Sequence, residues 1–197
     1  KVMREDPRRS FVERYEMLEQ RAREERRAAE DDYVQLARCA VETIVRTGKL
    51  PPVPAELPEE MTGRAGVYVT LTRDGTPRGT YGTFEPSAKS IADEITRNAA
   101  HAARNDTHVA PVTEEELDTL DITFDVLSEP ELVDGADALD PKTYGIIAES
   151  RGRKGVMLPA APGIETAEEQ LRAARKKGGI PEDAEIRIWR FTSERHA

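Results

Sequence analysis

The chain is poor in cysteine and in long apolar runs. Cys39 is the single cysteine among 197 residues, which excludes an internal disulfide framework and fits a reducing compartment. No apolar run approaches the roughly 20 residues that a membrane-spanning helix needs. The N-terminal residues also lack the apolar core of a signal peptide. These absences predict a cytoplasmic protein that does not enter a membrane.

Basic residues are outnumbered by acidic ones. The chain holds 29 Lys and Arg against 38 Asp and Glu, a net charge of −9. Residues 1–30 contain nine basic and eight acidic side chains. The remaining 167 residues therefore contain 20 basic and 30 acidic side chains. An acidic body repels phosphate backbones. Its two basic segments, ESRGRKG and RAARKKGG, are typical of a hairpin turn and of a helix C-terminus. We therefore expect no nucleic-acid partner.

Residues 8–30 predict one charged helix with a narrow apolar stripe. The apolar residues recur at intervals of four and three, which places them on one face: Phe11, Tyr15, Leu18 and Ala22. Such a stripe suits a coiled-coil seam or oligomer contact through residues 11–22, a linker helix against a neighbouring domain, or a solvated helix. Because the first residue is lysine rather than methionine, we expect a segment of a longer protein.

A folded domain is expected over residues 31–197, with residues 1–30 before it as a linker or interaction helix. The domain begins with a helix that has a wide apolar face and ends at Gly48. We expect Cys39 on that buried face, where a thiol is usually inert. The segments GVYVTLTRDG and RGTYGTF then flank an Asp-Gly turn and predict a hairpin.

Two further helices are marked by their N-terminal residues. Ser87 or Ser90 can cap the helix in SIADEITRNAAHAARND. Thr166 and Glu169 form a capping box for ETAEEQLRAARKKGG, which Gly178 ends.

The remaining segments predict strands. A second capping box, Thr113 to Glu116, opens a short turn before the alternating strand DITFDVL. YGIIAESRGRKGVMLP predicts a second hairpin, and AEIRIWRF a final strand. The chain thus repeats hairpin, helix and strand twice. We predict an α+β fold with a mostly antiparallel sheet and flanking helices, and an internal duplication is a hypothesis.

The segment Arg78-Gly79-Thr80-Tyr81-Gly82 is the main candidate ligand-binding site. Glycine weakens a strand interior unless the backbone must bend or another group must come close. In one interpretation the glycines bare backbone N–H groups to a ligand, and Arg78 offers a planar fork to a carboxylate or phosphate. In the other, the segment is a bulged strand whose glycines let the following helix pack closely.

Several segments carry a family likeness: RGTYGTFEP, APVTEEELD, YGIIAESRGRKGVMLP and EEQLRAARKKGGIPE. In this order and spacing they resemble the AMMECR domain family, whose bacterial and archaeal members are called AmmeMemoRadiSam system protein A. The resemblance spans about residues 31–191. It implies an α+β fold with unsettled biochemistry.

The resemblance also implies partners. Members of the family are associated with radical SAM proteins and with Memo-like proteins, which resemble class III extradiol (LigB-like) dioxygenases. In some bacteria the domain is fused to the Memo-like part. We therefore expect a Memo-like domain, fused or separate, and a radical SAM protein as partners, with residues 1–30 as the connector.

The family's most recognisable motif is Arg-Gly-Cys-Ile-Gly, and it matches Arg78 to Gly82. Thr80 stands here in place of the cysteine. A threonine hydroxyl needs a strong adjacent base to act as a nucleophile, and no histidine or lysine lies near Thr80 in sequence. The replacement argues against thiol chemistry at this position.

The histidines give no metal signal. His101 lies in a helix and His108 in the loop beyond it, and with Asp106 they form no i,i+4 pair and no third ligand in register. No metal is predicted, and no motif identifies a cofactor. We expect His196, at the C-terminus, to be mobile.

Two functional hypotheses follow. The first is an accessory interaction or small-ligand-binding module, not itself catalytic, that acts with the Memo-like partner. The alternative is an enzyme that uses residues 78–82 as an anion or oxyanion site, with Thr80 or Tyr81 as hydroxyl donor. Glu149 joins this site if it faces Arg78; otherwise it belongs to a solvated turn.

Overall fold

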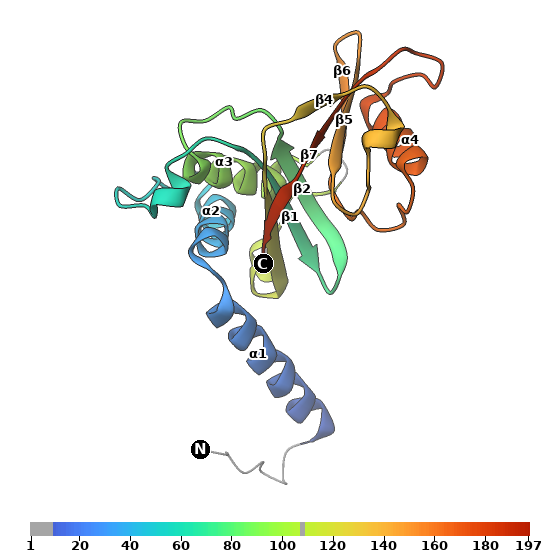
Figure 1. Cartoon of the computed structure of the whole chain (residues 1–197). Coiled ribbons are helices and arrows are strands. Elements are labelled where there is room, and N and C mark those ends of the chain that lie inside the picture. The colour runs from blue at the N-terminus through green and yellow to red at the C-terminus, as the bar shows by residue number, and fades with distance from the viewer. Residues whose placement is uncertain (1–9, 107–108) are drawn as a thin grey trace.

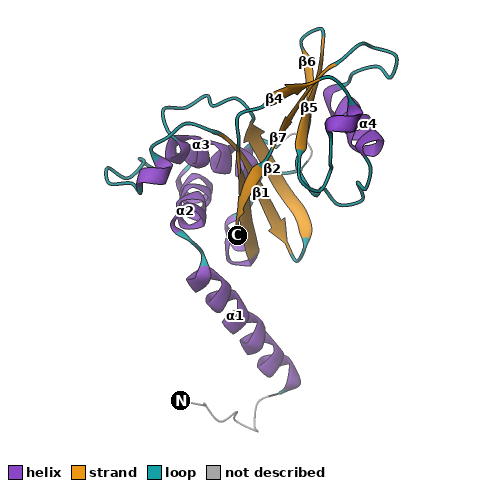
Figure 2. Cartoon of the chain, viewed as in Figure 1, coloured by secondary structure: helices purple, strands orange, loops and turns teal. Residues whose placement is uncertain are grey.

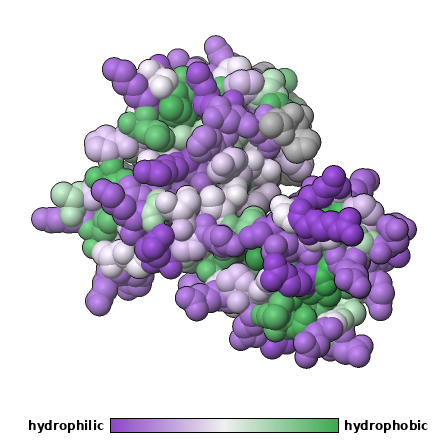
Figure 3. Space-filling view, turned by 90° about the horizontal axis from the view of Figure 1, so that it is seen from above, coloured by the Kyte–Doolittle hydropathy of each residue, from purple (hydrophilic) through white to green (hydrophobic). Residues whose placement is uncertain are grey.

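The computed structural model describes residues 10–106 and 109–197. The chain forms two antiparallel four-stranded sheets, the first packed against two helices and the second against one, and a further helix that projects from the body (Figures 1 and 2). This is the α+β fold that the sequence predicts. Seen from above, the surface is mostly hydrophilic, with apolar residues gathered in small separate patches (Figure 3).

The first lobe contains the sheet β2-β1-β3-β8 and two helices that pack on it. Its elements are α2 (Asp32–Thr47), η1 (Glu59–Met61), β1 (Gly66–Arg73), β2 (Thr76–Thr83), α3 (Ile91–Arg104), η2 (Glu114–Thr119), β3 (Leu120–Leu127) and β8 (Ser193–His196). Of the two predicted caps for α3, Ser90 is the one used, because its side chain accepts from the backbone N–H of Asp93. The core lies between the helices and the sheet, where Ile95 and Phe124 are fully buried.

The second lobe contains the sheet β4-β7-β5-β6 with one helix on it. Its elements are β4 (Glu131–Val133), η3 (Ala136–Ala138), β5 (Gly145–Ser150), β6 (Arg153–Met157), α4 (Ala167–Gly178) and β7 (Arg187–Phe191). The predicted Thr166–Glu169 capping box is present, and α4 ends at Gly178 with Gly179 in the left-handed cap conformation. A small core around Ile146 and Ala174 joins α4 to the sheet.

The two lobes share one strand order. In each, the second hairpin strand lies at the edge, the first hairpin strand lies beside it, and the strand after the helix comes next: β2-β1-β3 and β6-β5-β7. Both edge strands also bring a glycine against the helix of their lobe. A Cβ at Gly79 would overlap the carbonyl oxygen of Ala102 in α3, and a Cβ at Gly155 would overlap that of Ala174 in α4. In both lobes a glycine of the edge strand thus lets the helix backbone pack closely on the sheet. A duplication would produce this likeness.

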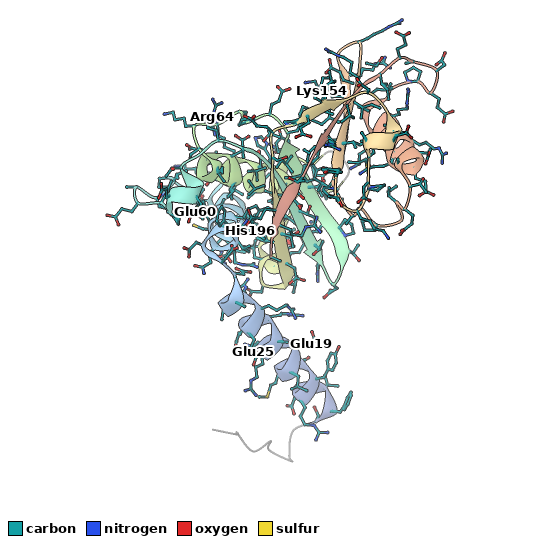
Figure 4. The ribbon with its side chains drawn as sticks, in the orientation of Figure 1. Glu19, Glu25, Glu60, Arg64, Lys154 and His196 are labelled. Atoms are coloured by element: carbon teal, nitrogen blue, oxygen red, sulfur yellow. The ribbon has the colours of Figure 1, made fainter. Side chains whose placement is uncertain are left out.

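Helix α1 (Phe11–Ala29) stands away from both lobes (Figure 1). None of its residues is buried, and Glu19 and Glu25 mark its projecting part in Figure 4. The Ser10–Glu13 capping box begins it. No helix within residues 10–106 and 109–197 is long and apolar enough to cross a membrane.

The prediction that Cys39 lies on a buried face is wrong, because its side chain is exposed. The face of α2 that contacts the core is centred on Ala37 and Val41. At 100° per residue, Cys39 lies about 200° around the helix from Ala37 and so faces outward. The apolar character of cysteine suggested burial, but the angular position of Cys39 on the helix determines that its side chain is exposed.

The prediction of a mobile His196 is also wrong. His196 belongs to β8 and pairs opposite Phe124 of β3. Its ring stacks on Phe124 at 4.8 Å and on Tyr33 at 4.3 Å between centroids, and its Nδ1 lies 2.6 Å from Asp31 Oδ2. Figure 4 shows it against the first lobe. The final strand holds the C-terminus because β8 pairs with β3 and the His196 side chain also contacts Tyr33 and Asp31.

The exposure of Cys39 leads to a direct prediction. We expect the native chain to react fully with an aromatic disulfide reagent, one thiol per chain, without denaturant, because a thiolate at the surface is accessible. Cys39→Ser should abolish the reaction. Labelling that requires unfolding in urea would instead place the thiol in the interior.

Candidate functional site

The segment Arg78 to Gly82 lies on β2, at the edge of the first sheet. It pairs on one side only, with β1, where Thr80 is opposite Thr70 and Gly82 is opposite Tyr68. The register shifts between Leu71 and Thr72 of β1, which face Gly79 and Pro77, so Arg78 is the extra residue and the bulge lies on β2. Edge strands leave backbone groups unpaired, so this segment could in principle offer N–H groups to a ligand.

Both glycines of the segment are explained by close packing. At Gly79 the backbone of α3 comes so near that a Cβ would overlap the Ala102 carbonyl. At Gly82 the ring of Tyr68, on the neighbouring strand, lies where a Cβ would be. These contacts support the interpretation in which the glycines let a helix and an aromatic ring approach the strand. The ligand-binding role remains a prediction.

Arg78 is held by a carboxylate and two carbonyls. Its Nε donates to Glu116 Oε1 at 2.6 Å and its Nη2 to Glu116 Oε2 at 2.7 Å. Nη1 donates to the carbonyl of Ala110 and Nη2 also to that of Pro111. Four of the five guanidinium N–H donors thus have protein acceptors. Arg78 fastens the start of η2 to the edge of the sheet.

This pairing shifts the ionisation of both partners. The hydrogen bond from Arg78 lowers the pKa of Glu116 to about 2, with burial opposing the shift and the Thr113 backbone N–H assisting it. The hydrogen bond to Glu116 raises the pKa of Arg78. The predicted capping box at Thr113 is present, but its glutamate also has this second role, which the sequence did not reveal.

Thr80 and Tyr81 contact two side chains at or just after the end of α3. The backbone N–H of Thr80 donates to Asp106 Oδ2 at 2.8 Å, and Thr80 Oγ1 lies 3.4 Å from the same oxygen. Tyr81 is 37% exposed, and its ring stacks on His101 at 4.6 Å between centroids. Asp106 therefore covers one unpaired N–H of the edge strand, and His101 covers one face of Tyr81.

A buried polar network at the end of β2 was missed by the sequence analysis. Glu94 is 1% exposed and accepts hydrogen bonds from the Thr83 hydroxyl, the Ser87 hydroxyl and backbone, and the Ala88 backbone. Asn98 donates to the Val67 carbonyl and to Thr83 Oγ1. The only available signal was the spacing of Glu94 and Asn98, which puts two polar side chains on the inward face of α3.

Glu149 does not join Arg78. It lies on β5 in the second lobe and accepts from Arg187 Nη2 at 3.0 Å. Its cross-strand neighbour Lys154, labelled in Figure 4, connects the two lobes. Its Nζ lies 2.8 Å from Glu85 Oε1 and 5.1 Å from the centre of the Phe84 ring.

The described residues contain no cluster of three side chains arranged to hold a metal. His101 is engaged with Tyr81 and with Asn105, and Asp106 with Thr80. His108 lies outside the described residues, as do residues 1–9 of the N-terminal segment. Nothing in the donor set of residues 78–82 identifies a cofactor.

Several known proteins are similar to this chain in sequence, and one solved structure is similar in fold. A protein of Thermotoga maritima is 44% identical over 170 residues, which cover 85% of this chain and 98% of that protein. A Clostridium acetobutylicum protein is 38% identical over 175 residues, but the chain spans only 37% of its length. The crystal structure of an uncharacterized protein from Pyrococcus horikoshii matches with a TM-score of 0.76 and 31% identity, covering 83% of this chain and 88% of that one.

The family assignment rests on these relatives and on a direct match. The AMMECR1 family model matches residues 34–196, which include both lobes and leave α1 outside. The likeness in sequence, the shared fold and the length of the match agree with one another. This chain therefore belongs to the AMMECR1 family.

Proposed function

We propose that this AMMECR1-family domain is an accessory interaction module that acts beside a Memo-like domain, with α1 as the element that contacts it. The observation that carries the proposal is the exposure of the α1 stripe. Phe11, Tyr15 and Leu18 are 74%, 56% and 58% exposed on a helix that buries none of its residues. An apolar stripe left without cover is typical of a partner contact.

The base of α1 supports this role because it is fixed to the body. Arg27 donates to the Leu117 carbonyl at 3.0 Å and lies 3.3 Å from Asp118. Arg26 lies 3.5 Å from Asp121, and Glu30 pairs with Arg38 of α2. These contacts anchor the last turn of the helix, so the exposed stripe is presented in a set direction.

The relatives support the same arrangement. The Clostridium acetobutylicum relative is more than twice as long as the stretch that it shares with this chain, so the domain occurs within a larger protein. The family resemblance names a Memo-like part as one such neighbour and a radical SAM protein as a further associate. In this proposal α1 joins the domain to the Memo-like surface, whether the two are fused or separate.

The alternative, an enzyme with residues 78–82 as an oxyanion site, has less support. An oxyanion site needs donors that are free to meet the developing charge. Arg78 already spends four donors on Glu116, Ala110 and Pro111, and Asp106 occupies the N–H of Thr80. A small-ligand role for the segment would have to use Tyr81 and the remaining backbone.

The proposal predicts a loss of partner binding without a loss of stability. We expect Phe11→Ser, Tyr15→Ser and Leu18→Ser together to weaken binding to a purified Memo-like protein from the same organism at least tenfold, measured by biolayer interferometry. The thermal midpoint of the body should not change, because α1 contributes nothing to either core.

A matched control lies on the opposite face of the same helix. Glu16→Ser, Gln20→Ser and Glu24→Ser change the same number of residues about half a turn away and should leave binding intact. Equal affinity for wild type and the stripe variant would remove α1 from the interaction, and equal loss in both variants would point to helix content rather than the stripe.

A further inference from the structure

A small hollow opens between the C-terminal ends of α2 and α3, away from Arg78. Its volume is about 250 Å³, slightly below the roughly 300 Å³ at which the range for small-molecule sites begins. One wall carries Arg97, His101, Arg104 and Asn105, and the other carries Ile44 and Leu50. The hollow therefore combines cationic donors on α3 with an apolar surface from α2 and the residues after it.

The two arginines of the hollow lack any acceptor among the described residues. Arg97 and Arg104 lie seven residues apart on α3, about 10 Å along its axis, with His101 between them on the same face. Most arginines of the body hold a carboxylate or carbonyl, as Arg38, Arg78 and Arg195 do. In a chain with a net charge of −9, two neighbouring guanidinium groups without a carboxylate form a local site for an anion.

His101 supplies a third donor in a fixed orientation. Asn105 Nδ2 lies 2.9 Å from His101 Nδ1. An amide nitrogen can only donate, so Nδ1 accepts and the neutral ring carries its proton on Nε2. The ring plane is held by stacking on Tyr81. Because Tyr81 belongs to the segment singled out in the sequence, that segment contributes to this site through His101.

The apolar wall indicates that the anion has a carbon part. Leu50 is 50% exposed, and Ile44 lines the same side. A fully hydrated inorganic ion gains nothing from such a wall, whereas an aromatic or aliphatic group loses water-exposed area against it.

We propose that this hollow binds a small organic oxyanion, a phosphate monoester or a carboxylate, with its charged group between Arg97 and Arg104 and its carbon part against Leu50. The proposal is independent of the α1 contact, so the failure of either leaves the other standing. Nothing in it requires a reaction.

Isothermal titration tests the site with three probes: phenyl phosphate, benzoate and inorganic phosphate. We expect at least one organic probe to bind saturably and at least tenfold more tightly than inorganic phosphate. A stronger response to phenyl phosphate would assign a phosphate ester, and a stronger response to benzoate a carboxylate. Absence of saturation by both organic probes up to about 10 mM would overturn the proposal, as would equal binding of inorganic phosphate.

Charge-matched variants locate the binding. Arg97→Gln with Arg104→Gln should weaken the organic probe at least tenfold, and both side chains are exposed, so the fold should persist. Arg151→Gln with Arg172→Gln removes the same charge from the second lobe and should change nothing. Equal weakening in both double variants would reduce the effect to net charge and overturn the site. A shift of the His101 Nε2–H signal on binding provides an independent readout.

Discussion

We expect Gly79→Ala to lower the free energy of unfolding by about 3 kcal/mol, with Gly155→Ala producing a loss of similar size. At both positions the added methyl group meets a helix carbonyl, of Ala102 and of Ala174 respectively. A helix backbone cannot move away as the end of a flexible side chain can. The strand and the helix must separate, which opens the core between them.

Urea denaturation at neutral pH measures the effect, and another glycine provides the control. Gly63 has nothing within 4 Å of the position of its Cβ, so Gly63→Ala should change stability by less than about 0.5 kcal/mol. If Gly79→Ala kept full stability, close packing would not explain the glycine. The interpretation in which it exposes backbone N–H groups to a ligand would then be favoured. A loss at Gly79 but not at Gly155 would contradict the equivalence of the two lobes.

Local signals account for what the sequence predicted correctly. The capping boxes at Thr113 and Thr166 and the Ser90 cap are made by residues three apart, so they can be found in the sequence. The Asp-Gly turn likewise marks the first hairpin. Together they predict the order of elements, and hence the α+β fold and the repeat of hairpin, helix and strand.

Long-range contacts account for the features that could not be predicted from the sequence. The partner of Arg78 is 38 residues away, and the spacing of charges along the chain gives no reason to choose Glu116 over its two acidic neighbours. The same holds for His196, whose contact with Asp31 joins the two ends of the domain. The Arg97–His101–Arg104 face was overlooked because a helical repeat of basic residues is ordinary until the structure shows that neither arginine has an acceptor within residues 10–106 and 109–197.

Arg78→Met should cost about 3 kcal/mol at pH 7, because it removes the partner of a largely buried carboxylate. The ordinary pKa of a glutamate is 4.5, and that of Glu116 in the fold is about 2, with the Arg78 hydrogen bond as the largest cause and the Thr113 hydrogen bonds as smaller ones. A difference of this size corresponds to roughly 3 kcal/mol, most of which is assigned to Arg78. Since the folded pKa is the lower one, this contribution is complete above about pH 4.5 and is lost as the pH falls toward 2. Methionine replaces the apolar stem of the arginine and removes every donor.

The pH dependence separates this ion pair from a general loss of packing. Unfolding by urea between pH 7 and pH 2 should show the difference between wild type and Arg78→Met shrinking as Glu116 becomes protonated. Arg73 lies 3.5 Å from the same carboxylate with its side chain 46% exposed, so Arg73→Met should cost less than about 1 kcal/mol. A difference for Arg78→Met that stays constant down to pH 2 would assign the loss to the Ala110 and Pro111 carbonyls. If Arg78→Met were as stable as wild type at pH 7, Arg78 would not be committed to the fold and would again be available to a ligand, as the sequence alone suggests.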